Sequence, residues 1–339
     1  MKKSLIAFGA ALACLGAAQA QSNVQLTGLV DMYVGSMKTA GNERTSQVGS
    51  GGMTTSWWGM NGTEDLGNGL KAGFALGAFF RADTGTPGRF NGDTFFARDA
   101  NVSLSGGFGT LKLGRSMAPN FLPTILFNPY GDSFTLSPLV LHSVGNNAAD
   151  TGWSNQITYS TPTFAGLRAN LQYQFGEQAG STGTNNVGAN LFYNQGPLAL
   201  TAVYEQADIG NPGLANYNAA GFSKDKWMLG AAYDFSVVKL YATYGQATQD
   251  FTTGASDIKK KTYSLGLDVP VTKAGTVKVA MAQTKTENTS GKWTTATVGY
   301  DHFLSKRTDA YAAAMYDKNN ALLDNKSGTS FAVGIRHRF

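Results

Sequence analysis

The 339-residue sequence carries a formal net charge of +5 at neutral pH, from 27 basic and 22 acidic residues. This balance is too mild to indicate a nucleic-acid-binding protein, so no nucleic-acid partner is expected. Charged residues make up only 14% of the chain, against about 25% in typical soluble domains, and the single cysteine excludes an internal disulfide framework.

The first twenty residues are predicted to be a signal peptide. A basic start precedes an apolar run over 5–18, and Ala18 and Ala20 form the small-x-small pattern of a cleavage site. The run is shorter than the ~20 apolar residues of a spanning helix, which disfavours a retained anchor. A lipoprotein signal at Cys14 is the other alternative, and the residues before it fit that pattern poorly. We therefore expect one domain over 21–339, without cysteine.

Alternation of apolar and polar residues dominates the rest of the chain. In 263–269 the odd positions are apolar and the even ones are small or polar, and 227–235 and 331–339 repeat the pattern. No stretch after residue 20 is apolar for long enough to span a bilayer as a helix. Low charge and short alternating segments together favour a closed transmembrane β-barrel, which satisfies its backbone groups between strands.

Sixteen such segments follow one another, joined by alternating short and long connectors. This number predicts an all-β fold, a single 16-stranded antiparallel transmembrane barrel. The expected strands are roughly 23–37, 54–63, 69–81, 94–105, 109–116, 153–161, 166–176, 185–195, 197–207, 225–235, 237–248, 260–270, 275–286, 292–303, 308–318 and 328–339.

The longest gap between predicted strands runs from Met117 to about Gly152. It is rich in Phe, Leu, Pro and Val rather than in charged residues, which argues against disorder. An apolar loop of this length is most simply buried. We therefore expect it to fold back into the barrel and to pack on the inner wall.

These features resemble the general porin family of Gram-negative bacteria, in the branch typical of β-proteobacteria. The resemblance covers the whole chain after the signal peptide, and the order and spacing of five short motifs carry it. The motifs are Ser22–Asp31, Gly62–Gly67, Leu113–Arg115, Ile157–Pro162 and Gly334–Phe339.

The resemblance implies an outer-membrane homotrimer whose water-filled channels pass ions and small hydrophilic solutes by passive diffusion. It implies a third loop that narrows each pore and sets acidic loop residues against arginines on the wall. The terminal Phe339 is similar to the signal that the outer-membrane assembly machinery reads. Its simpler interpretation is one more aromatic residue facing the membrane lipid.

Strand parity selects the wall residues that can reach the pore. Arg81, Lys112 and Trp57 fall on the faces opposite their apolar neighbours. Alternation alone would turn Arg98 outward, whereas the resemblance places a wall arginine there, and we follow the resemblance. Arg115 matches the family's Gly-Arg step, but its parity opposes that of Lys112, so anchoring of a loop or a subunit contact is the alternative.

The loop segment 127–132 resembles the family's Pro-aromatic-Gly-Asp tip, which makes Asp132 and Tyr130 candidates for the constriction. Asp132 holding a turn beside a glycine is the alternative. The sequence departs from the family at two positions, because Trp57 stands where an arginine is frequent and the segment around Trp153 lacks another. These departures imply a weak transverse field, a weak anion preference and easier passage of less polar or aromatic solutes.

Other functional classes find little support. The sequence has no Gly-x-Ser-x-Gly elbow, no P-loop and no Cys or paired-His cluster, so we expect no catalytic residues, metal or cofactor. His142, His302 and His337 lie on separate segments. The competing hypothesis is an adhesin-like or plugged structural barrel, which the apolar long loop, expected to lie inside the barrel, disfavours.

Overall fold

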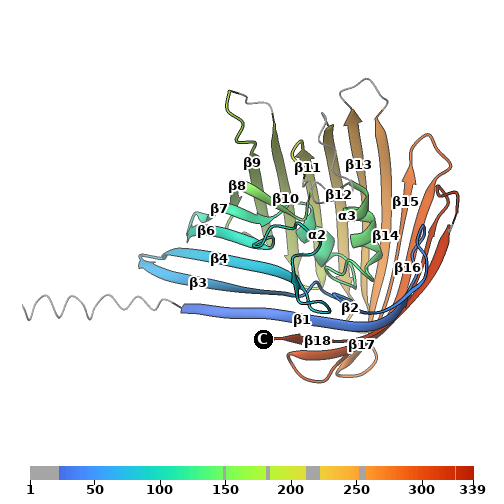
Figure 1. Ribbon diagram of the computed structural model, residues 1–339. Coiled ribbons are helices and arrows are strands. Elements are labelled where there is room, and N and C mark those ends of the chain that lie inside the picture. Colours follow the sequence, from blue (N-terminus) through green and yellow to red (C-terminus); the bar gives the residue numbers. More distant parts are fainter. Residues whose placement is uncertain (1–22, 148–149, 181–183, 211–221, 252–256, 325) are drawn as a thin grey trace, which may run out of the picture.

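The computed structural model describes residues 23–147, 150–180, 184–210, 222–251, 257–324 and 326–339, and the predicted signal peptide lies outside them. The chain forms one antiparallel sheet that closes on itself (Figure 1). The strands are β1 Asn23–Met37, β2 Thr45–Ser50, β3 Trp57–Gly67, β4 Leu70–Arg81, β5 Thr86–Pro87, β6 Asp99–Gly106, β7 Gly109–Met117, β8 Gly152–Ser160, β9 Leu167–Phe175, β10 Asn185–Gln195, β11 Leu198–Ala207, β12 Phe222–Asp234, β13 Lys239–Phe251, β14 Ile258–Pro270, β15 Gly275–Thr286, β16 Lys292–Phe303, β17 Thr308–Asn319 and β18 Ser327–Arg338.

Pairing of β1 with β18 closes the barrel, with Leu29 opposite Arg338 and Ser36 opposite Phe331. On its other edge β1 pairs with β3 along its first half and with β2 along its second half. These two strands therefore form one interrupted barrel strand, and the two-residue β5 only extends the end of β4. The predicted 16-stranded antiparallel barrel is confirmed.

The interruption between β2 and β3 has a local cause in β1. The carboxylate of Asp31 accepts hydrogen bonds from the backbone nitrogens of Met53 and Thr54, each at 2.7 Å. Because of these hydrogen bonds, residues 51–56 leave the sheet. The prediction of one strand over 54–63 was therefore wrong at its start, because a side chain buried on β1 captures backbone donors that the sheet would otherwise use.

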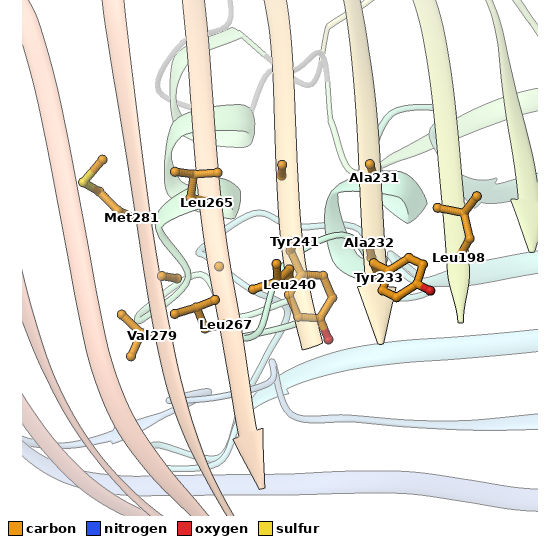
Figure 2. A pocket seen from close by; sticks show the side chains of 13 residues that line it. Leu198, Ala231, Ala232, Tyr233, Leu240, Tyr241, Leu265, Leu267, Val279 and Met281 are labelled. Atoms are coloured by element: carbon orange, nitrogen blue, oxygen red, sulfur yellow. The ribbon is translucent and has the colours of Figure 1, made fainter. Parts of the chain in front are cut away.

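The barrel exposes apolar side chains and buries polar ones, which is the reverse of the distribution in a soluble protein. Large apolar side chains on the outer face are exposed, for example Leu265 at 61% and Val333 at 64%. Polar side chains on the inner face are buried, for example Ser264 and Thr297. Figure 2 shows part of the outer face, where Leu240, Leu265 and Met281 project from β13, β14 and β15 around a shallow apolar hollow. This arrangement is the one that lipid outside and water inside require.

Aromatic side chains border the apolar band of the outer face on both sides. On one side Tyr244 of β13 stacks on Tyr263 of β14 with 4.8 Å between ring centroids, and on the other Tyr233 of β12 lies 4.4 Å from Phe235. Such bands are typical of the two membrane interfaces. Tyr311 is not part of these bands, because its side chain points inward and its hydroxyl donates a hydrogen bond to Asp31.

The long segment between β7 and β8 contains two helices that the sequence analysis did not predict, α2 (Phe121–Leu126) and α3 (Pro138–Asn147). Helix α3 begins with proline and follows Ser137, whose side chain accepts a hydrogen bond from the Val140 nitrogen as an N-cap does. Both helices lie within the curve of the wall (Figure 1). Within the described ranges, neither is long and apolar enough to cross a bilayer.

Candidate channel constriction

The segment 118–151, here called the constriction loop, lies directly on the inner wall at four glycines. These glycines occupy every second strand from β10 to β16. A Cβ added at Gly230 would lie 3.1 Å from the Phe127 ring, and one at Gly299 would lie 3.0 Å from the Tyr130 hydroxyl. Added Cβ atoms at the other two, Gly188 and Gly266, would collide with Pro119 and Pro129.

Because these glycines have no side chains, the loop backbone comes close enough to the wall to form hydrogen bonds with it. Tyr130 donates its hydroxyl hydrogen to the Lys278 carbonyl oxygen at 3.0 Å, and the Lys278 ammonium donates to the Pro129 carbonyl oxygen at 3.1 Å. The Leu136 carbonyl accepts from Thr297 at 2.8 Å. The loop is thus fixed against β15 and β16 by hydrogen bonds as well as by apolar packing.

Helix α3 is held on the wall through His142, which is buried and stacked on Trp293 at 3.9 Å. Thr295 donates its hydroxyl hydrogen to Asp317, so its oxygen must accept from the His142 Nε2 hydrogen at 2.9 Å. The His142 Nδ1 then accepts from Thr284 at 2.8 Å. Burial lowers the pKa of His142 to about 3, so the ring is uncharged at neutral pH.

The base of the loop is fastened by a chain of ion pairs. Arg115 contacts Asp150 at 2.7 Å, and Arg89 contacts the other oxygen of Asp150 at 2.9 Å. Arg89 also forms a two-pronged pair with Asp93. Burial by itself would raise the pKa of Asp150, but Arg89 and Arg115 outweigh it and hold that pKa below the usual range. Arg115 therefore anchors the loop base, as the parity argument allowed.

The tip of the loop carries Asp132, opposite wall cations. Burial raises the pKa of Asp132, against a hydrogen bond from Thr54 and the positive charges of Arg98 and Arg336. Arg336 donates to the Thr54 hydroxyl at 2.8 Å, so Thr54 links the loop carboxyl to β18. The Asp132 carboxyl of the loop thus lies within electrostatic reach of two arginines of the wall, Arg98 and Arg336.

Arg98 lies on the inner face, where the resemblance placed it and simple alternation did not. It precedes β6, and its guanidinium covers the Trp57 ring at 3.6 Å from the centroid. Trp57 pairs in register with Leu29, on the buried face of β1 that also carries Asp31. A nearby carboxylate, Asp99, lies 3.3 Å from the Arg98 Nε.

The remaining predicted residues divide into two groups. Lys112 is half-buried and lies on the inner face, opposite Ser103 and Thr158, and Arg81 lies at the end of β4. Tyr130 and Trp153 are each 2% exposed. These two aromatic side chains pack within the protein and present almost no surface to a passing solute.

Several residues of this site were not among the predictions. Arg168 lies on β9 with its guanidinium 5.6 Å from the Phe192 ring. Arg336 lies on the polar face of the last strand, so parity could have indicated it. The loop anchors Arg89 and Lys278 gave no local signal of this role, because the loop groups that they bind, Asp150 and the Pro129 carbonyl, are distant in sequence.

Carboxylates on the inner wall form ion pairs with cations of the same wall. Asp268 pairs with Lys278 at 3.1 Å, and Asp309 pairs with Arg336 at 3.0 Å and with Arg338 at 2.6 Å. In contrast, Arg81, Lys112 and Arg168 have no ion pair among the described residues. Three cations of the lumen are therefore not neutralised by a carboxylate.

The profile of the Gram-negative porin family matches residues 7–322. The chain belongs to this family. It is 36% identical to Outer membrane porin protein 32 of Delftia acidovorans and 30% identical to an outer membrane porin protein of Bordetella pertussis, in both cases over the full length of both chains. A solved structure, the anion-selective porin from Comamonas acidovorans, matches 94% of this chain and 100% of its own, with a TM-score of 0.80 and 32% identity.

Membership in the porin family identifies the barrel as a channel through the outer membrane of a Gram-negative bacterium, which the chain crosses repeatedly with its strands. A porin passes ions and solutes and catalyses no reaction, so the predicted function class and location are confirmed. Within the ranges that the structure describes, no group of metal-ligating side chains is found.

Proposed function

We propose that this porin is a passive-diffusion channel with a weak preference for anions, narrowed by the constriction loop. The observation that carries the proposal is the imbalance of free charge in the lumen. Arg81, Lys112 and Arg168 lack ion pairs in the described part of the chain, whereas the wall carboxylates are bound by cations or hydrogen-bond donors. Unpaired cations attract anions, and paired carboxylates repel them little.

The two sets of predicted residues take different parts in this channel. Arg98, Trp57 and Asp132 border the narrowest region, with Arg81 and Lys112 supplying positive charge near it. Arg115, Tyr130 and Trp153 hold the loop and its base in place. The anion selectivity that the name of the Comamonas acidovorans porin states supports the same sign of preference.

The working form is proposed to be a homotrimer without a cofactor, made from residues 21–339 after removal of the signal peptide. The family resemblance supports the trimer and the assembly machinery as partners. The exposed apolar outer face, including the hollow in Figure 2, supports contact with outer-membrane lipid.

The test is a reversal-potential measurement on the purified protein in planar bilayers under a KCl gradient. We expect a small potential of the sign produced by faster chloride. The variant with Arg81, Lys112 and Arg168 all changed to Gln should shift it toward cation preference. Strong cation selectivity of the unaltered protein would overturn the proposed charge imbalance, and an electrically silent bilayer would favour a plugged barrel.

A further inference from the structure

A separate cavity of about 310 Å³ lies beside the constriction loop, toward its base. It is bordered by the end of β4, by the segment after β2, by the segment after β5 and by both halves of the loop. Its volume lies at the lower end of the range for small-molecule sites. Among the residues that line it are Phe80, Arg81, Arg89, Phe90, Phe134 and Asp150.

Arg81 is the cation of this cavity that still has donor capacity. One terminal nitrogen donates to the Asn91 side chain at 2.8 Å. The Nε atom is buried and has no hydrogen-bond partner among the described residues. A guanidinium pairs side-on with a carboxylate through Nε and an adjacent terminal nitrogen. A small rotation of Arg81 would present this edge to an acceptor in the cavity.

The other charges of the cavity are already satisfied. Arg89 is bound by Asp93 and Asp150, and Asp150 is bound in turn by Arg115. This group of two arginines and two aspartates carries no net charge. The cavity therefore has a net positive charge contributed by Arg81.

The walls on either side of Arg81 are aromatic. Phe80, Phe90 and Phe134 come from three different segments, and all three line the cavity. The Phe90 ring is covered on one side by the Arg89 guanidinium at 5.3 Å, which fixes its position. Phenyl rings favour a flat apolar guest over a strongly hydrated one.

We propose that this cavity is a binding subsite for aromatic carboxylates, with Arg81 pairing to the carboxylate and Phe90 and Phe134 holding the ring. The inference rests on the proposed diffusion function, because it names a class of solute that the channel retains on its way through. A subsite of this kind raises the local concentration of such a solute at the entrance to the narrowest region.

The test uses benzoate as the probe. The single-channel KCl current is titrated with benzoate, with acetate (the carboxylate without a ring) and with benzyl alcohol (the ring without a charge). We expect benzoate to reduce the current at concentrations at least about tenfold below those of the other two, because it alone uses both halves of the site.

One variant tests the charged half of the site and another its aromatic half, and a third variant is the matched control. Arg81→Gln should raise the half-blocking concentration of benzoate about tenfold, by loss of a charge-assisted pair. Phe134→Leu should raise that of benzoate and leave that of acetate unchanged. Lys112→Gln removes one lumen charge elsewhere and should change the benzoate value less than about twofold.

Equal block by benzoate and acetate, or equal shifts for Arg81→Gln and Lys112→Gln, would overturn the subsite. If the unaltered protein does not conduct, the proposed diffusion function fails by itself. The subsite is then decided by equilibrium dialysis of radiolabelled benzoate against the detergent-solubilised protein and Phe134→Leu. If Arg81→Gln does not fold, Arg81→Lys takes its place, since an ammonium keeps the charge but loses the side-on pair.

Discussion

Pro129 of the constriction loop rests on Gly266 of β14, where a Cβ would collide with the proline ring. The wall cannot yield, because both edges of β14 are hydrogen-bonded to neighbouring strands. The added volume in Gly266→Ala must therefore push the loop toward the lumen, at a cost of about 1–3 kcal/mol. We expect the single-channel conductance to fall.

The matched control is Gly107→Ala, since Gly107 lies in the turn between β6 and β7 and a Cβ there meets open space. Both variants should fold, as judged by heat-dependent mobility in detergent gels. An unchanged conductance in Gly266→Ala would mean that the loop does not set the width of the pore. At four positions of the wall, glycine thus leaves the space that the constriction loop occupies.

The strands could be predicted from the sequence, whereas the helices of the constriction loop could not. Each strand carries its own signal, since every second residue must suit lipid or water, and this fixes its faces and most of its extent. The starts predicted at 54 and 94 were too early, because β3 begins at Trp57 and β6 at Asp99. Helices α2 and α3 have no such independent signal. Their sequence is apolar on several sides because one side packs on the wall and another on the rest of the loop.

The candidate site residues likewise divide into those that a local sequence pattern could place and those that it could not. Parity placed Lys112 and Trp57 on the inner face without knowledge of any partner. For Arg98 parity gave the wrong face, because the residue precedes the first pair of β6 and is held over Trp57 by a contact across the sheet. Ion pairs such as that of Arg115 with Asp150 join distant segments, and no local pattern encodes them.

The docking of helix α3 should depend on pH through His142. The docked ring has a pKa of about 3, whereas a ring exposed by a detached helix regains a value near ~6.5. The detached state therefore binds the proton first as the pH falls. Docking is fully stable above pH ~6.5 and loses roughly 1.4 kcal/mol per pH unit between the two values.

We expect the open-channel current noise to rise as the pH is lowered from 7 to 4. In His142→Gln the rise should be absent, because an amide occupies the same position and does not titrate in this range. His302→Gln, which changes a histidine bonded to Tyr300 on the outer face of β16, should behave as the unaltered protein. The same acid-induced noise in all three proteins would assign it to other groups.

The stability of the barrel depends on its closure. A barrel has no free edge only if its first and last strands pair, so the terminal residues carry a role that no other hairpin has. Gly28 and Phe339 exchange two backbone hydrogen bonds, of 3.1 and 3.0 Å, and the Phe339 ring covers the space where Gly28 lacks a side chain. Phe339 is thus part of the junction between the first and last strands, here called the seam.

Phe303 provides a matched control for Phe339, because both side chains are 42% exposed and both lie near the end of a strand. If Phe339 only faces lipid, Phe339→Ala and Phe303→Ala should lower the yield of folded, heat-resistant barrel equally. If its ring also orders the seam, Phe339→Ala should cost more by the ring's packing on Gly28, about 1 kcal/mol or more. Refolding into detergent without any assembly protein isolates this physical term. An excess loss for Phe339→Ala in cells and equal losses in detergent would place its importance in recognition by the assembly machinery instead of in closure.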